Sequence, residues 1–499
     1  MPIGTISFVQ EPVNSADKIP VITNWTPLIG YMVYQTDISG LFYFKLILEV
    51  YTGTSVVATN LIGTIKQRRN GYGPDNDGAT QRARAYFDLR ELVNTVLVDT
   101  IWDQNVSGQP FSPIHSVGAN AGYLDKIYSE NGDHKQEKTQ ISAIYVKAYQ
   151  EYSSAANTSP DINDSETVND TLWYLQASTS LFRPRDDDAA FLQSNFFQAY
   201  QGSSINDFFL SDVESSVAEY NIGSVRRNYV QDTDYHTVAF LNDYTNFQSD
   251  IDWIGIIYYD STGSVIGNAQ YIANTNANGG AIPNSEADTD AERLIYFGCG
   301  PQNLESSTVP AYSSAGTSAG AAQPSNFAGW AYYTVAGYNG SFALMTTLYF
   351  FIKQDGSCKG FKVRRLGWRN SLGCYDYWNF KMKSTQTINV TRNNYNSILG
   401  RFDGSKFSYN DTQRGKTTRQ TAATLKETLN TDWITEQDAN LLEKLIMSTN
   451  VYIIKNADTD YTQGVIVTNS SFVRKTSAND KLIKYTINIE YANPVNTNS

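Results

Sequence analysis

Apolar and polar residues alternate in many segments of the chain, a pattern that predicts β-strands because side chains two residues apart share one face of a strand. Segment 41–51 is the first clear case, and segment 481–491 is another. The apolar face of the first segment consists of Phe42, Phe44, Leu46, Leu48 and Val50. The corresponding face of the second consists of Ile483, Tyr485, Ile487, Ile489 and Tyr491. Both segments are therefore expected to be strands that cover a core.

Turn-forming residues interrupt further apolar runs in the middle of the chain. Two such runs between residues 252 and 267 flank the sequence Asp260-Ser261-Thr262-Gly263, which predicts a β-hairpin. The strongly apolar run 341–353 predicts another strand or strand pair. Polar stretches between these elements are interpreted as loops, and they cover residues 66–82, 153–170, 274–290 and 313–326.

Capping residues and an apolar stripe predict one helix in the C-terminal part of the chain. Thr435 suits the N-cap position, and Asp438 three residues later completes an arrangement like a capping box. An apolar stripe follows and consists of Leu441, Leu442, Leu445 and Ile446. Strand-like segments come after this helix, so the C-terminal part is expected to be α+β, with one helix packed on a sheet.

These elements predict a mainly β chain of several antiparallel β-sandwich-like domains with a C-terminal α+β unit. Residues 1–152 are expected to form an N-terminal β-domain. Residues 153–355 are expected to form a central β-rich domain with long polar loops, and residues 356–499 the C-terminal α+β domain.

Composition supports a β-rich chain, since 34 Tyr and 23 Phe among 499 residues suit strands. A formal net charge of −12, from 38 Lys and Arg against 50 Asp and Glu, argues against a nucleic-acid binder and against docking on anionic lipid. The basic run 364–369 alternates with apolar residues, which favours a sheet edge or an interface over a nucleic-acid contact. Because no transmembrane segment or signal peptide is apparent, synthesis in the cytoplasm without membrane insertion is expected.

Patterns that carry chemistry are weak in this sequence. Residues 316–320 match the G-x-S-x-G sequence motif of a nucleophile elbow. They lie, however, in a Ser/Ala/Gly-rich stretch with no strand before them and no helix after them. Segment 75–78 lacks the ligand spacing of a calcium loop, and the charged run 183–188 suits a solvated cluster. No metal-site spacing relates the three histidines, His115, His134 and His236. The chain is therefore predicted to be no enzyme, with no cofactor and no metal site.

The most distinctive segment is 364–395. It combines an Asn-Leu-Gly turn, an aromatic-Asp-aromatic step and later Phe, Lys-Ser, Arg and Tyr positions, which are Asn370, Leu372, Gly373, Tyr375, Asp376, Tyr377, Phe380, Lys383, Ser384, Arg392 and Tyr395. A helix-then-strand unit ending at Ile454 follows, and the chain closes with segment 481–493. Over about the last third of the chain, these features resemble structural proteins of tailed bacteriophages, especially myovirus-like phages of marine and Bacteroidota hosts.

The resemblance implies a structural protein of the virion, in the tail or baseplate, with no catalytic residues. Its expected partners are other virion structural proteins and further copies of itself. Large aromatic side chains suit such interfaces. The best candidate interface is the aromatic-dense group Trp368, Tyr375, Tyr377, Trp378 and Phe380. The same rings also suit a hydrophobic core, and the sequence leaves both interpretations open.

Two alternative functions remain at this point. A host-recognition protein would bind a receptor or a host surface glycan through aromatic platforms and Asn or Asp side chains, and the chain has both residue types. It shows none of the repeats or coiled-coil heptads of a fibre, however. A neck or adaptor protein is the other alternative, although that class tends to be helical and this sequence is not.

Overall fold

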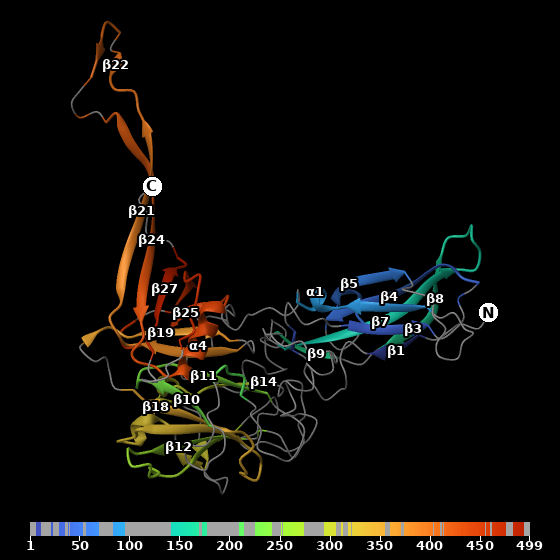
Figure 1. Cartoon of the computed structure of the whole chain (residues 1–499), viewed down its shortest axis with the longest axis horizontal. Helices are drawn as coiled ribbons and strands as arrows, with labels where there is room; N and C mark the ends of the chain where they lie inside the picture. The colour runs from blue at the N-terminus through green and yellow to red at the C-terminus, as the bar shows by residue number, and fades with distance from the viewer. Residues whose placement is uncertain are drawn as a thin grey trace. The chain divides into compact units, whose positions relative to one another are not determined.

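A computed structural model covers the chain, and Figure 1 shows it. The residues that it describes are 6–10, 21–22, 29–34, 38, 40–52, 56–68, 83–94, 141–168, 172–176, 209–213, 225–241, 251, 253–273, 294–305, 311–312, 318–320, 322–354, 360–370, 374–402, 404–409, 412, 414–454, 456–459, 462–475 and 483–493. The predicted fold class is confirmed, because the chain is mainly β with several antiparallel sheets and few helices.

The chain forms two compact units. Unit 1 comprises Met1–Arg227, His236–Phe351 and Asn370–Tyr375. Unit 2 comprises Asn228–Tyr235, Ile352–Arg369 and Asp376–Ser499. The chain therefore crosses between the units several times, whereas the sequence predicted three consecutive domains.

Two sheets form the N-terminal part of unit 1. A three-stranded sheet has the order β1 (Ile6–Gln10), β3 (Ile29–Tyr34), β6 (Arg84–Asp88). The other sheet has the order β2 (Val21–Ile22), β9 (Leu172–Gln176), β7 (Ile141–Ser153), β4 (Phe42–Thr52), β5 (Leu61–Arg68), and β8 (Asp161–Val168) also pairs with β7. The described residues of this part include two short helices, η1 (Ala58–Asn60) and α1 (Arg90–Asn94).

Strand β4 confirms the first predicted strand. Phe44, Leu46, Leu48 and Val50 are buried in one core cluster with side chains from β6 and β7. Phe42, at the start of the same face, is exposed instead. Burial of the alternating apolar face is what fixes the register of β4 between β5 and β7, because a one-residue slip would turn that face outward.

A seven-stranded sheet occupies the middle of the chain. Its order is β10 (Val225–Val230), β18 (Leu348–Lys353), β17 (Tyr332–Tyr338), β12 (Trp253–Tyr259), β13 (Gln270–Ala273), β15 (Ala311–Tyr312), β16 (Ser318–Gly320). A separate pair is formed by β11 (Thr237–Leu241) and β14 (Leu294–Gly298). The described residues here also include the short helices α3 (Pro301–Glu305) and η4 (Pro324–Asn326).

The hairpin predicted after β12 is confirmed. The backbone N–H of Asp260 donates to the carbonyl of Ser264, and the Asp260 carboxylate accepts from the N–H groups of Thr262 and Ser264. Gly263 has φ +83°, a backbone conformation that glycine adopts without steric cost. The turn residues therefore act as the sequence indicates.

Unit 2 is built on a second seven-stranded sheet. Its order is β20 (Tyr375–Phe380), β19 (Arg364–Arg369), β25 (Val451–Ile454), β26 (Gln463–Val467), β27 (Thr486–Tyr491), β24 (Lys416–Asn430), β21 (Thr385–Asn396). The predicted helix is α4 (Glu436–Met447), with Thr435 as its N-cap and Asp438 completing a capping box. Its apolar stripe is buried at Leu441, Leu442 and Leu445.

A long two-stranded ribbon extends this sheet. β21 and β24 pair from Thr385 and Thr428 to Asn396 and Lys416. β24 also pairs with β27, but only from Lys426 to Asn430. Among the described strands, the ribbon beyond these residues therefore has two strands only, and a small hairpin of β22 (Arg401–Phe402) and β23 (Phe407–Ser408) lies at its far end (Figure 1). Residues 388–425 are called the arm below.

Candidate functional site

Only some of the predicted chemical features lie within the described part of the chain. No cluster of three or more His, Cys, Asp or Glu side chains there could hold a metal ion. His236 is buried, with its ring edge-on to Phe351 at a centroid distance of 4.8 Å. Ser318 begins strand β16 and does not sit at a strand-to-helix turn, as a nucleophile elbow requires. The remaining predicted features lie outside the described residues: His115, His134 and segments 75–78 and 183–188.

A buried ion pair joins β19 to β24. Arg364 Nε donates to Glu427 Oε1 at 2.9 Å, and both side chains are almost completely buried. Tyr491 and Gln386 donate to the other oxygen of the same carboxylate. Burial by itself would raise the pKa of Glu427, but these hydrogen bonds and the charge of Arg364 outweigh it and hold the pKa below its usual value. The carboxylate is thus held ionised and fully bonded, which suits a structural role.

The neighbouring arginine makes a second buried cluster. Arg365 Nη1 lies 3.2 Å from Asp234 Oδ2 and 2.8 Å from Asn379 Oδ1, and its Nε donates to the carbonyl of Tyr235. The guanidinium carbon lies 5.2 Å from the centre of the Tyr377 ring. Because Arg365 and Asp234 have no exposed side-chain surface, this part of the basic run 364–369 faces the interior and not a nucleic acid.

The five aromatic residues proposed as an interface lie in the interior of the chain. Their exposed fractions are 0% for Trp368, 4% for Tyr375, 0% for Tyr377, 7% for Trp378 and 1% for Phe380. All six residues of β20 are buried, so both faces of this strand are covered. These rings are therefore core residues, which corrects the choice of this group as the subunit interface.

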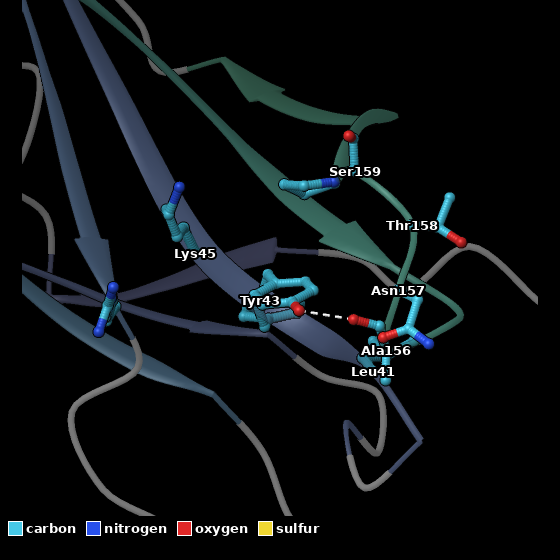
Figure 2. Close-up of a pocket in the computed structure, with 10 residues that line it drawn as sticks. Leu41, Tyr43, Lys45, Ala156, Asn157, Thr158 and Ser159 are labelled. Atoms are coloured by element: carbon cyan, nitrogen blue, oxygen red, sulfur yellow. Dashed lines mark hydrogen bonds between the residues drawn. The ribbon is translucent and has the colours of Figure 1, made fainter.

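Unit 1 carries a surface pocket of about 840 Å³. It is lined by Leu41, Tyr43, Phe44, Lys45, Arg68, Ala156, Asn157, Thr158, Ser159 and Pro160. Figure 2 shows the Tyr43 ring in the pocket, with its hydroxyl donating to the carbonyl of Ala156 at 2.5 Å. Tyr43 is 57% exposed and has φ 56°, a left-handed conformation that is uncommon for a residue other than glycine.

The positive charge of Lys45 in this pocket is balanced by a carboxylate of unit 1. Lys45 Nζ lies 3.3 Å from Glu151, which also pairs with Lys66. Burial raises the pKa of Glu151, but the hydrogen bonds and charges of Lys66 and Lys45 outweigh it and lower the pKa overall. Lys45 in the lining is therefore ion-paired, and Arg68 adds a further cation to the lining.

The arm concentrates exposed apolar surface. Twenty large hydrophobic side chains are exposed among the described residues, and eight of them lie in the arm: Ile388, Val390, Tyr395, Ile398, Leu399, Phe402, Phe407 and Tyr409. All residues of β21 are exposed, so neither face of this strand packs on a core. A concentration of exposed large apolar side chains is typical of interaction sites in soluble proteins.

The tip of the arm is a defined structure. The N–H of Ser397 donates to the carbonyl of Gly415 at 2.7 Å, which continues the ribbon past β21. Gly400 has φ +97°, and a Cβ added there would lie 2.3 Å from Cζ of Phe407. Glycine at this position thus lets the Phe407 ring lie against the turn, while Phe407 itself remains mostly exposed. Sequence patterns did not single out this region, because its exposed strands lack an apolar face of regular period.

No family model and no curated protein matches the chain. In the part of the chain that the structure describes, no helix combines the length and apolarity needed to cross a bilayer.

Proposed function

We propose that the chain is a non-enzymatic structural component of a phage virion, in the tail or baseplate, and that it acts through interfaces between subunits. The arm is the observation that carries the proposal. A two-stranded ribbon is marginally stable alone in water, and this one exposes apolar side chains along its length. A ribbon of this kind is useful to a protein that lays it on a neighbour, where both the strands and the apolar tip become covered.

Further support comes from the interior of the molecule and from its charge. The buried ions Arg364, Glu427, Arg365 and Asp234 are paired inside the fold, which suits structural residues more than reacting groups. The net charge of −12 opposes non-specific aggregation of free subunits. The phage-like segments of the last third support placement in a virion, with other virion proteins and further copies of the chain as partners.

The proposal predicts that the chain co-purifies with intact particles. After density-gradient separation of an infected-cell lysate, its peptides should follow the particle peak in constant ratio to known virion proteins. An enzyme made during infection but not packaged serves as the control, since it should stay in the soluble fractions. Recovery of the chain only with that control would contradict a structural role in the virion. If the chain follows the particle peak, a map of the intact particle would locate it.

A host-recognition protein is the second candidate, and the pocket around Tyr43 favours it. An exposed aromatic ring beside Lys45, Arg68 and Asn157 could stack on a sugar ring and bond its hydroxyl or acidic groups. The left-handed backbone of Tyr43 adds to this case, because strained residues cluster at binding sites.

For this candidate we expect Tyr43→Ala to weaken binding of an acidic host polysaccharide by about tenfold, or about 1.4 kcal/mol. Glycan-array binding followed by calorimetry would measure it. The matched control is Tyr86→Ala, which removes a similarly exposed tyrosine that lies outside both the pocket and the arm. Equal binding by both variants, or no glycan bound by the unmodified chain, would rule out this pocket as a glycan site.

A further inference from the structure

The arm has the opposite charge to the rest of the chain. Its residues 388–425 include two acidic side chains, Asp403 and Asp411, and six basic ones, so its net charge is +4. The remaining residues carry 32 Lys and Arg against 48 Asp and Glu, a net charge of −16. The basic side chains of the arm are Arg392, Arg401, Lys406, Arg414, Lys416 and Arg419.

We infer that the arm docks on the body of a second copy of this chain, where the body means all residues outside 388–425. The inference rests on the proposed function, in which the arm forms an interface between subunits, and it names the partner at that interface. Charge complementarity selects this partner: a cationic arm is attracted to an acidic body and steered toward it, whereas two arms repel each other. A second copy is always present at the concentration of the chain itself.

The arm is large enough to form one side of a stable interface. A standard interface uses about 20–30 residues on each partner, and the arm contains 38 residues. Its exposed aromatic residues Phe402, Phe407 and Tyr409 lie at the tip, where they can act as anchors in a pocket of the partner. β21 is the last strand in the sheet order, so its outer edge can also pair with a strand of the neighbour.

An arm that binds a body uses two different surfaces. Such a contact is heterologous when each copy offers its arm to one neighbour and its body to another, and isologous when two copies exchange arms around a two-fold axis. Heterologous contacts generate closed rings when the rotation closes, and open filaments when it does not. The assembly expected from this chain is therefore a dimer with exchanged arms, a ring or a filament, and not a dimer in which two arms meet.

Removal of the arm tests the inference. Thr387 and Lys426 face each other in the ribbon, so a two-residue Asn-Gly turn can replace residues 388–425 and close the shortened hairpin. Analytical ultracentrifugation over a concentration series should show assemblies of the full chain and only monomers of the armless chain. The melting temperatures of unit 2 should agree in the two proteins, which shows that the body remains folded.

Mixing the two proteins separates arm-to-body docking from arm-to-arm docking. The armless chain retains the body surface, so it should bind the arm of the full chain and end the growing assembly in small complexes. Failure of the armless chain to bind the full chain would overturn the inference, as would a full chain that stays monomeric at every concentration. An armless chain that assembles like the full chain would overturn it as well.

Single substitutions keep the test valid if the armless chain does not fold. Arg419→Glu on the arm should raise the dissociation constant several-fold, whereas Lys362→Glu makes the same charge change outside the arm and should leave it unchanged. Higher salt should weaken assembly of the unmodified chain, because exposed charges are screened. Equal effects of the two substitutions, or binding of the arm to duplex DNA in place of the chain, would overturn the inference.

Assembly of the purified chain is measured without particles. If the chain assembles through its arm but is absent from virions, the proposed function fails and the docking inference stands. If the chain is found in virions but does not assemble, the inference alone fails.

Discussion

Replacing Glu427 with alanine is expected to lower the free energy of unfolding of unit 2 by about 3–5 kcal/mol. The substitution leaves the guanidinium of Arg364 buried without its carboxylate partner, which lies 2.9 Å away in the native chain. It also removes the acceptor of the Tyr491 hydroxyl. Urea unfolding followed by circular dichroism measures the loss.

Lys426→Ala is a matched control at the adjacent position. Lys426 also forms an ion pair across strands, with Glu490 at 3.1 Å, but both side chains are partly exposed. Exposed pairs contribute about 0–1 kcal/mol, because water and salt screen them. Similar losses for Glu427→Ala and Lys426→Ala would show that the Arg364–Glu427 pair is not the buried structural pair described above.

The pKa of Glu427 adds a pH dependence with a definite sign. Because the pKa is lower in the folded chain than in the unfolded chain, the ionised carboxylate stabilises the fold at pH values above its ordinary pKa of about 4.5. That stability is lost as the pH falls below 4.5 and through the folded-state value. In Glu427→Gln, which cannot ionise, the stability of unit 2 should fall less steeply over the same acid range.

Elements with a regular pattern and a clear end could be predicted from the sequence. β4 and β27 alternate because one face of each strand packs on a core. α4 begins at Thr435 because a hydroxyl and a carboxylate there satisfy backbone N–H groups that a helix start leaves unpaired. In these cases local chemistry and burial lead to the same structure.

The division of the chain could not be predicted in the same way. The N-terminal sheet does not end at residue 152, because β8 and β9 pair with β7 after an intervening polar stretch. β2 then pairs in parallel with β9, across more than a hundred residues. Such long-range pairing has no local signature, and polar residues such as those of β8 look like a loop until the partner strand is known.

The arm was missed for a related reason. Every residue of β21 is exposed, and the arm part of β24 has no fully buried residue, so no core selects a strongly apolar face there. Two other features could have indicated it: the excess of basic residues in 388–425 and apolar side chains within a polar stretch. Both are signals of binding, whereas periodicity is a signal of folding.

The aromatic segment 364–380 shows the opposite case, in which the sequence does not separate core from interface. Trp368 has no exposed surface, and its neighbour Gly367 lets the Tyr377 ring approach: a Cβ added at Gly367 would lie 2.9 Å from that ring. Trp368→Ala is therefore expected to lower the free energy of unfolding by about 3–5 kcal/mol, through lost apolar burial and an unfilled cavity. Hydrogen exchange in β19 and β25 measures this loss without tryptophan fluorescence.

Phe402→Ala is the matched substitution on the arm, and the pair of variants separates folding from assembly. Phe402 is 64% exposed, so its removal should change the stability of the isolated chain by less than about 0.5 kcal/mol. It should nevertheless weaken association between copies, because an apolar anchor is lost from the docking surface. A Trp368→Ala chain as stable as the unmodified one, but unable to associate, would return the interface to the aromatic segment, since a core side chain cannot be removed without a loss of folding stability.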